Sequence, residues 1–175
     1  QGRYKEAERC FVEARRIYTE ARGAGDFDVG QACNGLGATY CDSGRYEEGM
    51  GLLDEALWIY RTTQGERSLE AGQCLSEIGE ALIDPGKLDE ALERLEEAYG
   101  IFKELRAVEI VPDLLSDMSD SYRQLNNLDK ALEKGSEALR FARNSGSETK
   151  ISVALSNTGV VHRMAGRLAE ARECA

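Results

Sequence analysis

The 175-residue sequence is poor in proline and histidine, with only Pro85, Pro112 and His162. So few prolines leave long stretches free to be helical, because proline inside a helix removes a backbone hydrogen bond and clashes with the preceding turn. A single histidine offers little for acid–base catalysis, and no nucleophile motif such as GxSxG accompanies it. We therefore expect His162 to be a packed residue rather than a base or ligand.

Paired cysteines are also missing. The five cysteines are an odd number without a CxxC pair, which argues against both a disulfide framework and a thiolate zinc site. We expect them to be reduced and to act as small apolar packing residues. They are Cys10, Cys33, Cys41, Cys74 and Cys174.

The sequence contains no apolar run near the roughly 18 to 20 residues that cross a bilayer, and no leader resembling a signal peptide. We therefore expect no membrane span and a cytoplasmic, reducing location. The net charge of -10 and pI near 4.8 argue against nucleic acid and anionic membranes, which select basic surfaces. A basic peptide or protein is the electrostatically favoured partner, while the oligomeric state stays open.

Both ends of the sequence lie within helical patterns. The chain starts at Gln1 rather than Met, and it stops at Ala175 inside another periodic segment. We expect it to be a fragment of a longer protein.

What the sequence does contain is an internal repeat. Similar turn segments such as SGRYEEG, PGKLDEA and AGRLAEA recur along the chain. Measured between Gly2, Gly44, Gly86, Asn126 and Gly166, their spacings are 42, 42, 40 and 40 residues. Regular spacing of this length is typical of stacked repeat units.

Each turn is preceded by an apolar quartet at i, i+3, i+4, i+7, the period of a helix stripe. The third member of the quartet is always small. A small residue on a buried stripe lets the following antiparallel helix approach closely, which offsets the roughly 1 kcal/mol that glycine costs in a helix. These small residues are Gly37, Gly79, Ser119 and Gly159.

A second helical pattern, rich in alanine, follows each turn, so each unit is a pair of helices. We expect Ser68 and Ser147 to cap helices, Pro112 to lie in a first turn, and the chain to form nine helical segments. The sequence predicts one array with approximate units 1–25 (second helix only), 26–67, 68–107, 108–146 and an incomplete 147–175.

This pattern resembles the tetratricopeptide repeat. The small residue followed three positions later by an aromatic, as in LGATY and MSDSY, looks like that family's signature, as do the GRY and GKL turns. The long period is similar to the repeats of kinesin light chains and Pins/LGN-type adaptors. Cys33 stands where the family usually has Trp, His162 where it has Tyr, and Gly49 and Gly135 replace alanine or a larger residue.

The resemblance implies an all-α fold, a right-handed superhelical solenoid of antiparallel helix pairs whose first helices line a concave groove. The groove residues are those that flank each buried quartet on the other side of the first helix. They are Gln31, Asn34, Ala38, Gln73, Ser76, Glu77, Glu80, Asp84, Asp113, Ser116, Asp117, Asp120, Arg123 and Asn157.

Acidic residues concentrate on this face in the centre of the chain. Glu77, Glu80 and Asp84 share one helical face, and a second stripe holds Asp113, Asp117 and Asp120. Such stripes can be merely solvated. The functional hypothesis is a groove for a segment bearing Lys or Arg, whose backbone bonds to Asn34, Asn157, Gln73 and the serines. The family's carboxylate clamp is not expected, because its Lys and Arg positions here carry Ser, Glu and Asp.

No cofactor, metal site or catalytic constellation is indicated, so we expect a non-enzymatic interaction scaffold. The alternative is a purely architectural rod or assembly interface within a larger protein. Trp58 is expected to pack against the connection between units, with an exposed partner anchor as the second interpretation.

Overall fold

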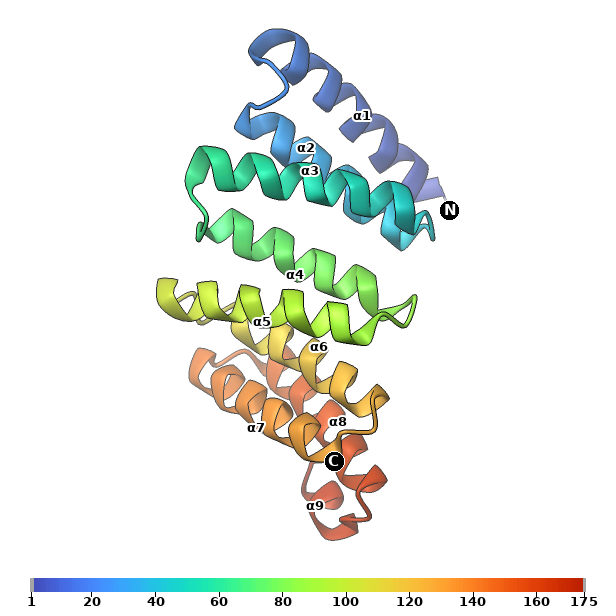
Figure 1. Ribbon diagram of the computed structural model, residues 1–175. Helices are drawn as coiled ribbons and strands as arrows, with labels where there is room; N and C mark the ends of the chain where they lie inside the picture. Colours follow the sequence, from blue (N-terminus) through green and yellow to red (C-terminus); the bar gives the residue numbers. More distant parts are fainter. Residues whose placement is uncertain (1, 175) are drawn as a thin grey trace. The chain divides into compact units, whose positions relative to one another are not determined.

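A computed structural model describes residues 2–174, with side chains from Tyr4 onward. Over this range the chain forms nine helices and no strand, which confirms the expected all-α class (Figure 1). The helices are α1 (Gly2–Arg22), α2 (Phe27–Asp42), α3 (Tyr46–Gln64), α4 (Leu69–Ile83), α5 (Leu88–Leu105), α6 (Val111–Gln124), α7 (Leu128–Ser145), α8 (Glu148–Met164) and α9 (Leu168–Glu173).

The chain divides into two compact units, Gln1–Pro85 and Gly86–Ala175. The first unit holds α1 to α4 and the second holds α5 to α9. Their boundary falls in the turn between α4 and α5, inside the repeat expected at 68–107. A single continuous array over both units stays a prediction.

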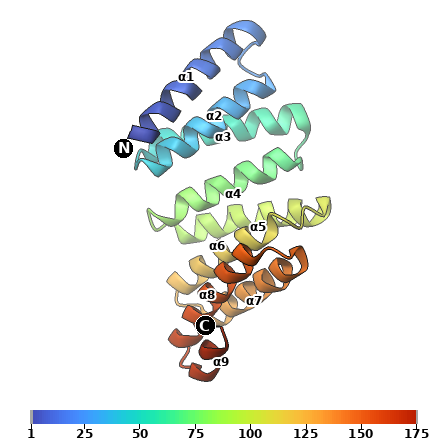
Figure 2. The ribbon, with the colours of Figure 1, turned by 180° about the vertical axis from the view of Figure 1, so that it is seen from behind.

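Sequential helices pack side by side within each unit (Figures 1 and 2). In the first unit α2 and α3 form the closest pair, α1 packs on α2, and α4 packs on both α3 and α2. In the second unit α6 and α7 form the closest pair, while α8 packs on both of them and α9 packs on α8. The expected helix pairs are therefore confirmed.

The tight turns use left-handed residues, as the repeat predicts. Gly44, Gly86 and Gly166 have φ values of 85°, 79° and 73°, and Asn126 has a φ of 57°. Glycine adopts this conformation without a Cβ penalty, and asparagine is the usual substitute. The same position therefore ends each first helix.

The predicted helix starts are also present. The Ser68 hydroxyl accepts a hydrogen bond from the Ala71 backbone N–H at 3.2 Å, and that of Ser147 accepts one from Lys150 at 3.4 Å. Pro112 lies in the first turn of α6, where its missing N–H leaves no helical bond unmade.

Small residues bring the paired helices into backbone contact. A Cβ added to Gly37 in α2 would lie 2.9 Å from the Gly49 carbonyl oxygen in α3, and one added to Gly49 would lie 2.7 Å from the Gly37 oxygen. In the second unit the Ser119 hydroxyl donates to the Ala131 carbonyl at 2.8 Å. The reason proposed for the repeated small residues is therefore confirmed at both pairs.

The core follows the expected quartets except at the C-terminal end. The first three apolar quartets precede the turns at Gly44, Gly86 and Asn126. They are buried apart from their aromatic members, Tyr40 and Tyr122, which are half-buried. In the last quartet only Thr158 is buried, whereas Leu155 and His162 are half-buried. The described part of α9 has six residues, too few to cover the whole of α8.

Two glycines of α3 test the role of close packing. Gly49→Ala should cost about 1 to 3 kcal/mol, because the new methyl overlaps the α2 backbone. Gly51→Ala is the matched control: no atom lies within 4 Å of its added Cβ, so it should gain about 1 kcal/mol from helix propensity. Urea unfolding followed by circular dichroism measures both, and equal effects would contradict the packing role.

Candidate binding surface

In the first unit, two predicted groove residues meet across neighbouring first helices. Asn34 on α2 donates a hydrogen bond from Nδ2 to Oε2 of Glu77 on α4, at 2.7 Å. Both side chains are half-buried. The bond forms because α4 packs on α2, which brings positions 43 residues apart in sequence to the same face. We call this pair the Asn34–Glu77 site.

The Asn34–Glu77 site is short of hydrogen-bond donors. Burial raises the pKa of Glu77 to about 7, the hydrogen bond from Asn34 opposes this rise, and the carboxylates of Glu80 and Asp42 add to it. The Asn34 Oδ1 atom is buried and has no hydrogen-bond partner within the described chain. Within this pair the Asn34 amide group donates to Glu77 Oε2, whereas the Asn34 Oδ1 acceptor is left without a donor.

The other α2 and α4 residues of the predicted set differ in exposure. Gln31, Gln73 and Glu80 are exposed, and Ala38 is half-buried. Asp84 is exposed and accepts a hydrogen bond from the Tyr46 hydroxyl at 3.4 Å.

Two serines of the predicted set lie inside the packing. Ser76 is 8% exposed and Ser116 is 6% exposed, and the Ser116 hydroxyl donates to the Pro112 carbonyl. Both serine side chains are small enough to be buried between neighbouring helices, so neither hydroxyl belongs to an open surface.

In the second unit the acidic stripe is largely paired within the protein. Asp113 on α6 bonds to the ammonium of Lys150 on α8 at 2.7 Å. Asp120 accepts from Arg123 Nε at 2.8 Å and from Gln124 Nε2 at 2.7 Å. These partners reduce the negative charge that the sequence pattern suggested for this face.

A small cavity of about 210 Å³ brings three predicted residues of the second unit together. Asp120 and Arg123 come from α6, and Asn157 comes from α8. It is lined by Ser119, Asp120, Arg123, Asn157, Val160 and Val161. This cavity offers a cation, an anion and an amide at one place.

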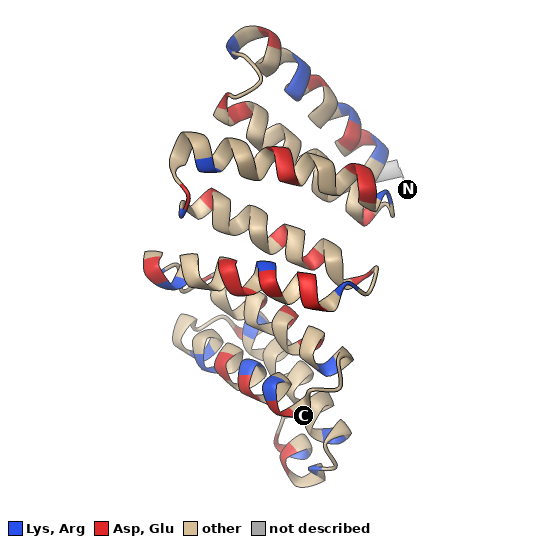
Figure 3. Cartoon of the chain, viewed as in Figure 1, with Lys and Arg blue, Asp and Glu red and all other residues tan. Residues whose placement is uncertain are grey.

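Charge is distributed differently on the two acidic first helices. Figure 3 shows acidic positions in red and none in blue on α4, whereas α6 carries Arg123 in its last turn. The sequence predicts that the two acidic stripes are neighbours, one on α4 in the first unit and the other on α6 in the second. Their adjacency stays a prediction.

The structure agrees in part with the expectations for His162, Trp58 and the cysteines. His162 is half-buried, but its Nδ1 atom is buried without a hydrogen-bond partner in the described chain. Trp58 lies beside Gly25 in the α1–α2 connection, as expected, yet it is 60% exposed. Cys10 is exposed, contrary to the packing role expected for it, and Cys174 is half-buried.

Sequence reasoning missed the partners that lie one repeat away. Lys150 follows Asp113 by 37 residues and Tyr46 precedes Asp84 by 38, so each contact depends on how successive helix pairs stack within one unit. Within residues 2–174, no group of His, Cys, Asp and Glu could hold a metal ion. None of the described helices is long and apolar enough to cross a membrane.

The raised pKa of Glu77 predicts a pH-dependent stability. In the unfolded chain this carboxyl loses its proton near its ordinary value of 4.5, so its contribution destabilises the fold as the pH rises from about 4.5 to 7. Glu77→Gln should therefore be more stable than wild type at pH 8, by about 1 to 3 kcal/mol after allowance for partial exposure.

The difference between Glu77→Gln and wild type should vanish below about pH 4.5, where the carboxyl is neutral in both states. Asp54→Asn, which changes an exposed carboxylate on α3, is the control and should show no comparable gain. Urea unfolding across this pH range measures the effect, and a pH-independent difference would contradict the assignment.

The tetratricopeptide repeat family matches residues 28–104. A search of the curated proteins gives no match. Among solved structures, BtubC (BKLC) from P. vanneervenii superposes with a TM-score of 0.88 at 22% identity, covering 99% of this chain and 71% of that one. A kinesin light chain-type protein of Podosopora anserina with nearly identical TPR-like repeats gives a TM-score of 0.81 at 16% identity, covering 99% and 84%.

RapI, in its apo form, superposes with a TM-score of 0.84 at 17% identity over 99% of this chain and 47% of its own length. These superpositions cover both units of the chain. They agree with the helix pairs described above. Residues 28–104 match the model of the tetratricopeptide repeat family, and the described chain has the all-α fold of tetratricopeptide-like helical solenoids.

Proposed function

We propose that the protein is a non-enzymatic scaffold that binds a protein or peptide segment along the exposed faces of its first helices. The observation that carries this proposal is the donor shortage at the Asn34–Glu77 site. A buried acceptor without a hydrogen-bond partner destabilises the protein by about 1 to 3 kcal/mol. A ligand that supplies a donor at this atom would therefore bind more tightly.

The chemistry of the Asn34–Glu77 site favours a segment bearing Lys or Arg. A ligand ammonium or guanidinium next to Glu77 would stabilise the ionised carboxylate and lower its raised pKa. A backbone N–H of the ligand could bond to Asn34 Oδ1 after a small side-chain movement. Glu80 and the C-cap residue Asp84 follow Glu77 at i+3 and i+7, so they extend the same acidic face.

The second unit would contact a ligand differently. At the small cavity Asp120 is already paired with Arg123, so added positive charge gains little there. Asn157 and the Asp120–Arg123 pair together present both donors and acceptors, which suits the peptide groups of an extended backbone. We therefore assign charge preference to the first unit and backbone contacts to the second.

A structural role is the second candidate. Trp58 is 60% exposed on α3, a second helix, and exposed aromatic side chains commonly anchor protein interfaces. In this alternative the protein would act as an architectural rod whose contacts use the second helices. We also propose a reducing, cytoplasmic location, which the five free thiols support.

A library of extended peptides tests the main proposal. The purified chain should select peptides with Lys or Arg over otherwise identical peptides with Glu or Ala. Glu77→Gln combined with Glu80→Gln should weaken binding of the selected peptide by about tenfold, the loss expected for one partly buried charge contact.

The matched control places the same two charge losses on α3. Glu47→Gln with Asp54→Asn removes two exposed carboxylates from a second helix, and it should leave peptide affinity unchanged. Selection of neutral or acidic peptides would refute the charge preference. A loss of binding with the α3 variant alone would favour the structural alternative.

A further inference from the structure

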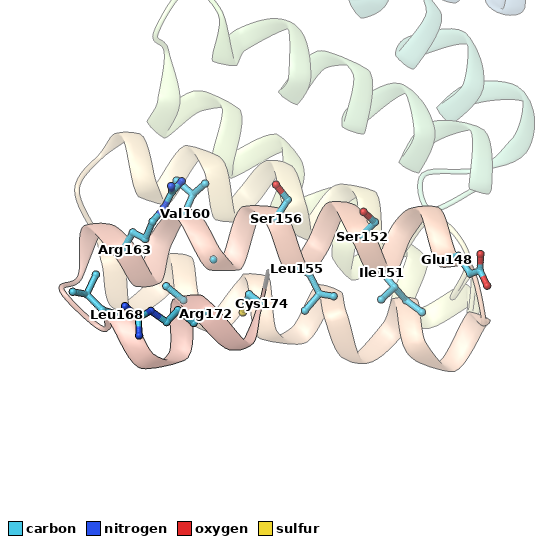
Figure 4. Close-up of a pocket in the computed structure, with 12 residues that line it drawn as sticks. Glu148, Ile151, Ser152, Leu155, Ser156, Val160, Arg163, Leu168, Arg172 and Cys174 are labelled. Carbon is cyan, nitrogen blue, oxygen red and sulfur yellow. The ribbon is translucent and has the colours of Figure 1, made fainter.

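Asn34 occupies a position at which the other first helices carry serine. Counted from the start of each apolar quartet, the equivalents of Asn34 on α4, α6 and α8 are Ser76, Ser116 and Ser156. Figure 4 shows the last of these, Ser156, on α8. Asparagine at this position is therefore an exception within the repeat.

The serines and the asparagine satisfy their polar atoms differently. The Ser116 hydroxyl donates to the Pro112 carbonyl of its own helix at 2.9 Å, so it needs no partner from outside. The amide nitrogen of Asn34 reaches Glu77, but Asn34 Oδ1 is buried without a hydrogen-bond partner in the described chain. Packing does not account for this asparagine, because serine fills the same position elsewhere without leaving a buried acceptor unpaired.

Two acceptors of the Asn34–Glu77 site lie close together. Glu77 Oε2 accepts from Asn34 Nδ2 at 2.7 Å, and Glu77 Oε1 makes no hydrogen bond with the described chain. Since Oδ1 and Nδ2 of Asn34 are bonded to the same carbon, Oδ1 lies within a few ångströms of the carboxylate. The terminal torsion of asparagine is soft, so a ligand group at the carboxylate can also reach Oδ1 when the amide turns slightly.

The charged groups around Glu77 favour a cation at this place. Asp42, which ends α2, and Glu80, one turn further along α4, both act on the Glu77 carboxyl group as negative charges. The guanidinium of arginine spreads its N–H donors over a planar fork and is weakly hydrated. The ammonium of lysine concentrates its donors on one strongly hydrated nitrogen, so a half-buried site with two separate acceptors suits it less well.

We propose that Asn34 makes the first unit selective for arginine over lysine, because one guanidinium bridges the Glu77 carboxylate and Asn34 Oδ1. This inference rests on the proposed function, which treats the two cationic residues as equivalent, and it makes Asn34 a specificity-determining residue. A lysine ligand pairs with Glu77 alone, and Asn34 Oδ1 then needs a donor from the ligand backbone.

Three versions of one peptide test the proposal. They share the tightest basic sequence from the peptide library, and one basic position carries Arg, Lys or citrulline, the neutral analogue of arginine. Fluorescence anisotropy with the 175-residue chain should show the Arg version binding at least about fivefold more tightly than the Lys version. The citrulline version should bind more weakly than both, because it keeps N–H donors but lacks the charge.

Asn34→Ser removes the proposed discriminating atom and installs the residue of the three equivalent helices. The ratio of Arg to Lys affinity should fall below about twofold, while the Lys version binds as it does to wild type. The control, Asn144→Ser, changes an exposed asparagine on α7 and should leave both affinities unchanged. Circular dichroism should show Asn34→Ser at least as stable as wild type, since a buried unpaired acceptor is gone.

The side-chain amide of Asn34 reports the contact directly. Its NMR signals, assigned by their loss in Asn34→Ser, should move more on saturation with the Arg version than with the Lys version, because the guanidinium bonds to Oδ1. Equal movement with the two peptides would contradict the bridging contact.

The outcomes separate this inference from the proposed function. Equal affinity for the Arg and Lys versions, with both weakened by Glu77→Gln, would overturn the arginine preference and leave the proposed function standing. An Arg preference that survives Asn34→Ser would place the discriminating contact elsewhere and overturn the inference. A library that yields no basic peptide, or binding that Glu77→Gln does not weaken, would overturn the proposed function and the inference with it.

Discussion

The structure depends on close contact between helix backbones at small residues. Gly37 and Gly49 place the α2 and α3 backbones so close that either Cβ would collide with the opposite carbonyl oxygen. Ser119 takes the equivalent place in the second unit and adds a hydrogen bond to the α7 backbone. The helix propensity lost at each glycine, about 1 kcal/mol, is repaid by the packing that this contact permits.

Close packing of the helices within each unit also determines which polar residues of successive helix pairs meet. Since the helices of each unit pack side by side, the first helix α4 lies against the first helix α2, and α8 lies against α6. Asn34 and Glu77 meet for this reason, as do Asp113 and Lys150. The candidate binding surface is therefore a consequence of repeat stacking, and it is carried by helices rather than by loops.

Much of the fold could be predicted because it depends on local patterns. The turn glycines, the serine caps and the first three quartets follow from backbone conformation and helix periodicity, which a single sequence displays. The candidate surface was predicted less completely. Helix periodicity placed Ser76 and Ser116 on the surface face, but neighbouring helices bury them.

The charge state of the surface could not be predicted from one helix at a time. Asp113 and Glu77 look alike in the sequence, yet one faces a lysine and the other faces an amide. That difference arises from residues about 40 positions away, whose facing partners depend on the exact rotation of each helix.

The central claim is that stacking of α4 on α2 holds the Glu77 carboxyl half-buried beside Asn34, whose Oδ1 atom lacks a hydrogen-bond donor. Carbon-detected NMR titration of the Glu77 carboxyl group tests this claim directly. The structure predicts a midpoint at about pH 7 in the free protein, and a lower midpoint when a lysine-containing segment is bound. A free-protein midpoint at the ordinary value of 4.5 would contradict the account, because Glu77 would then be solvated rather than held between the helices.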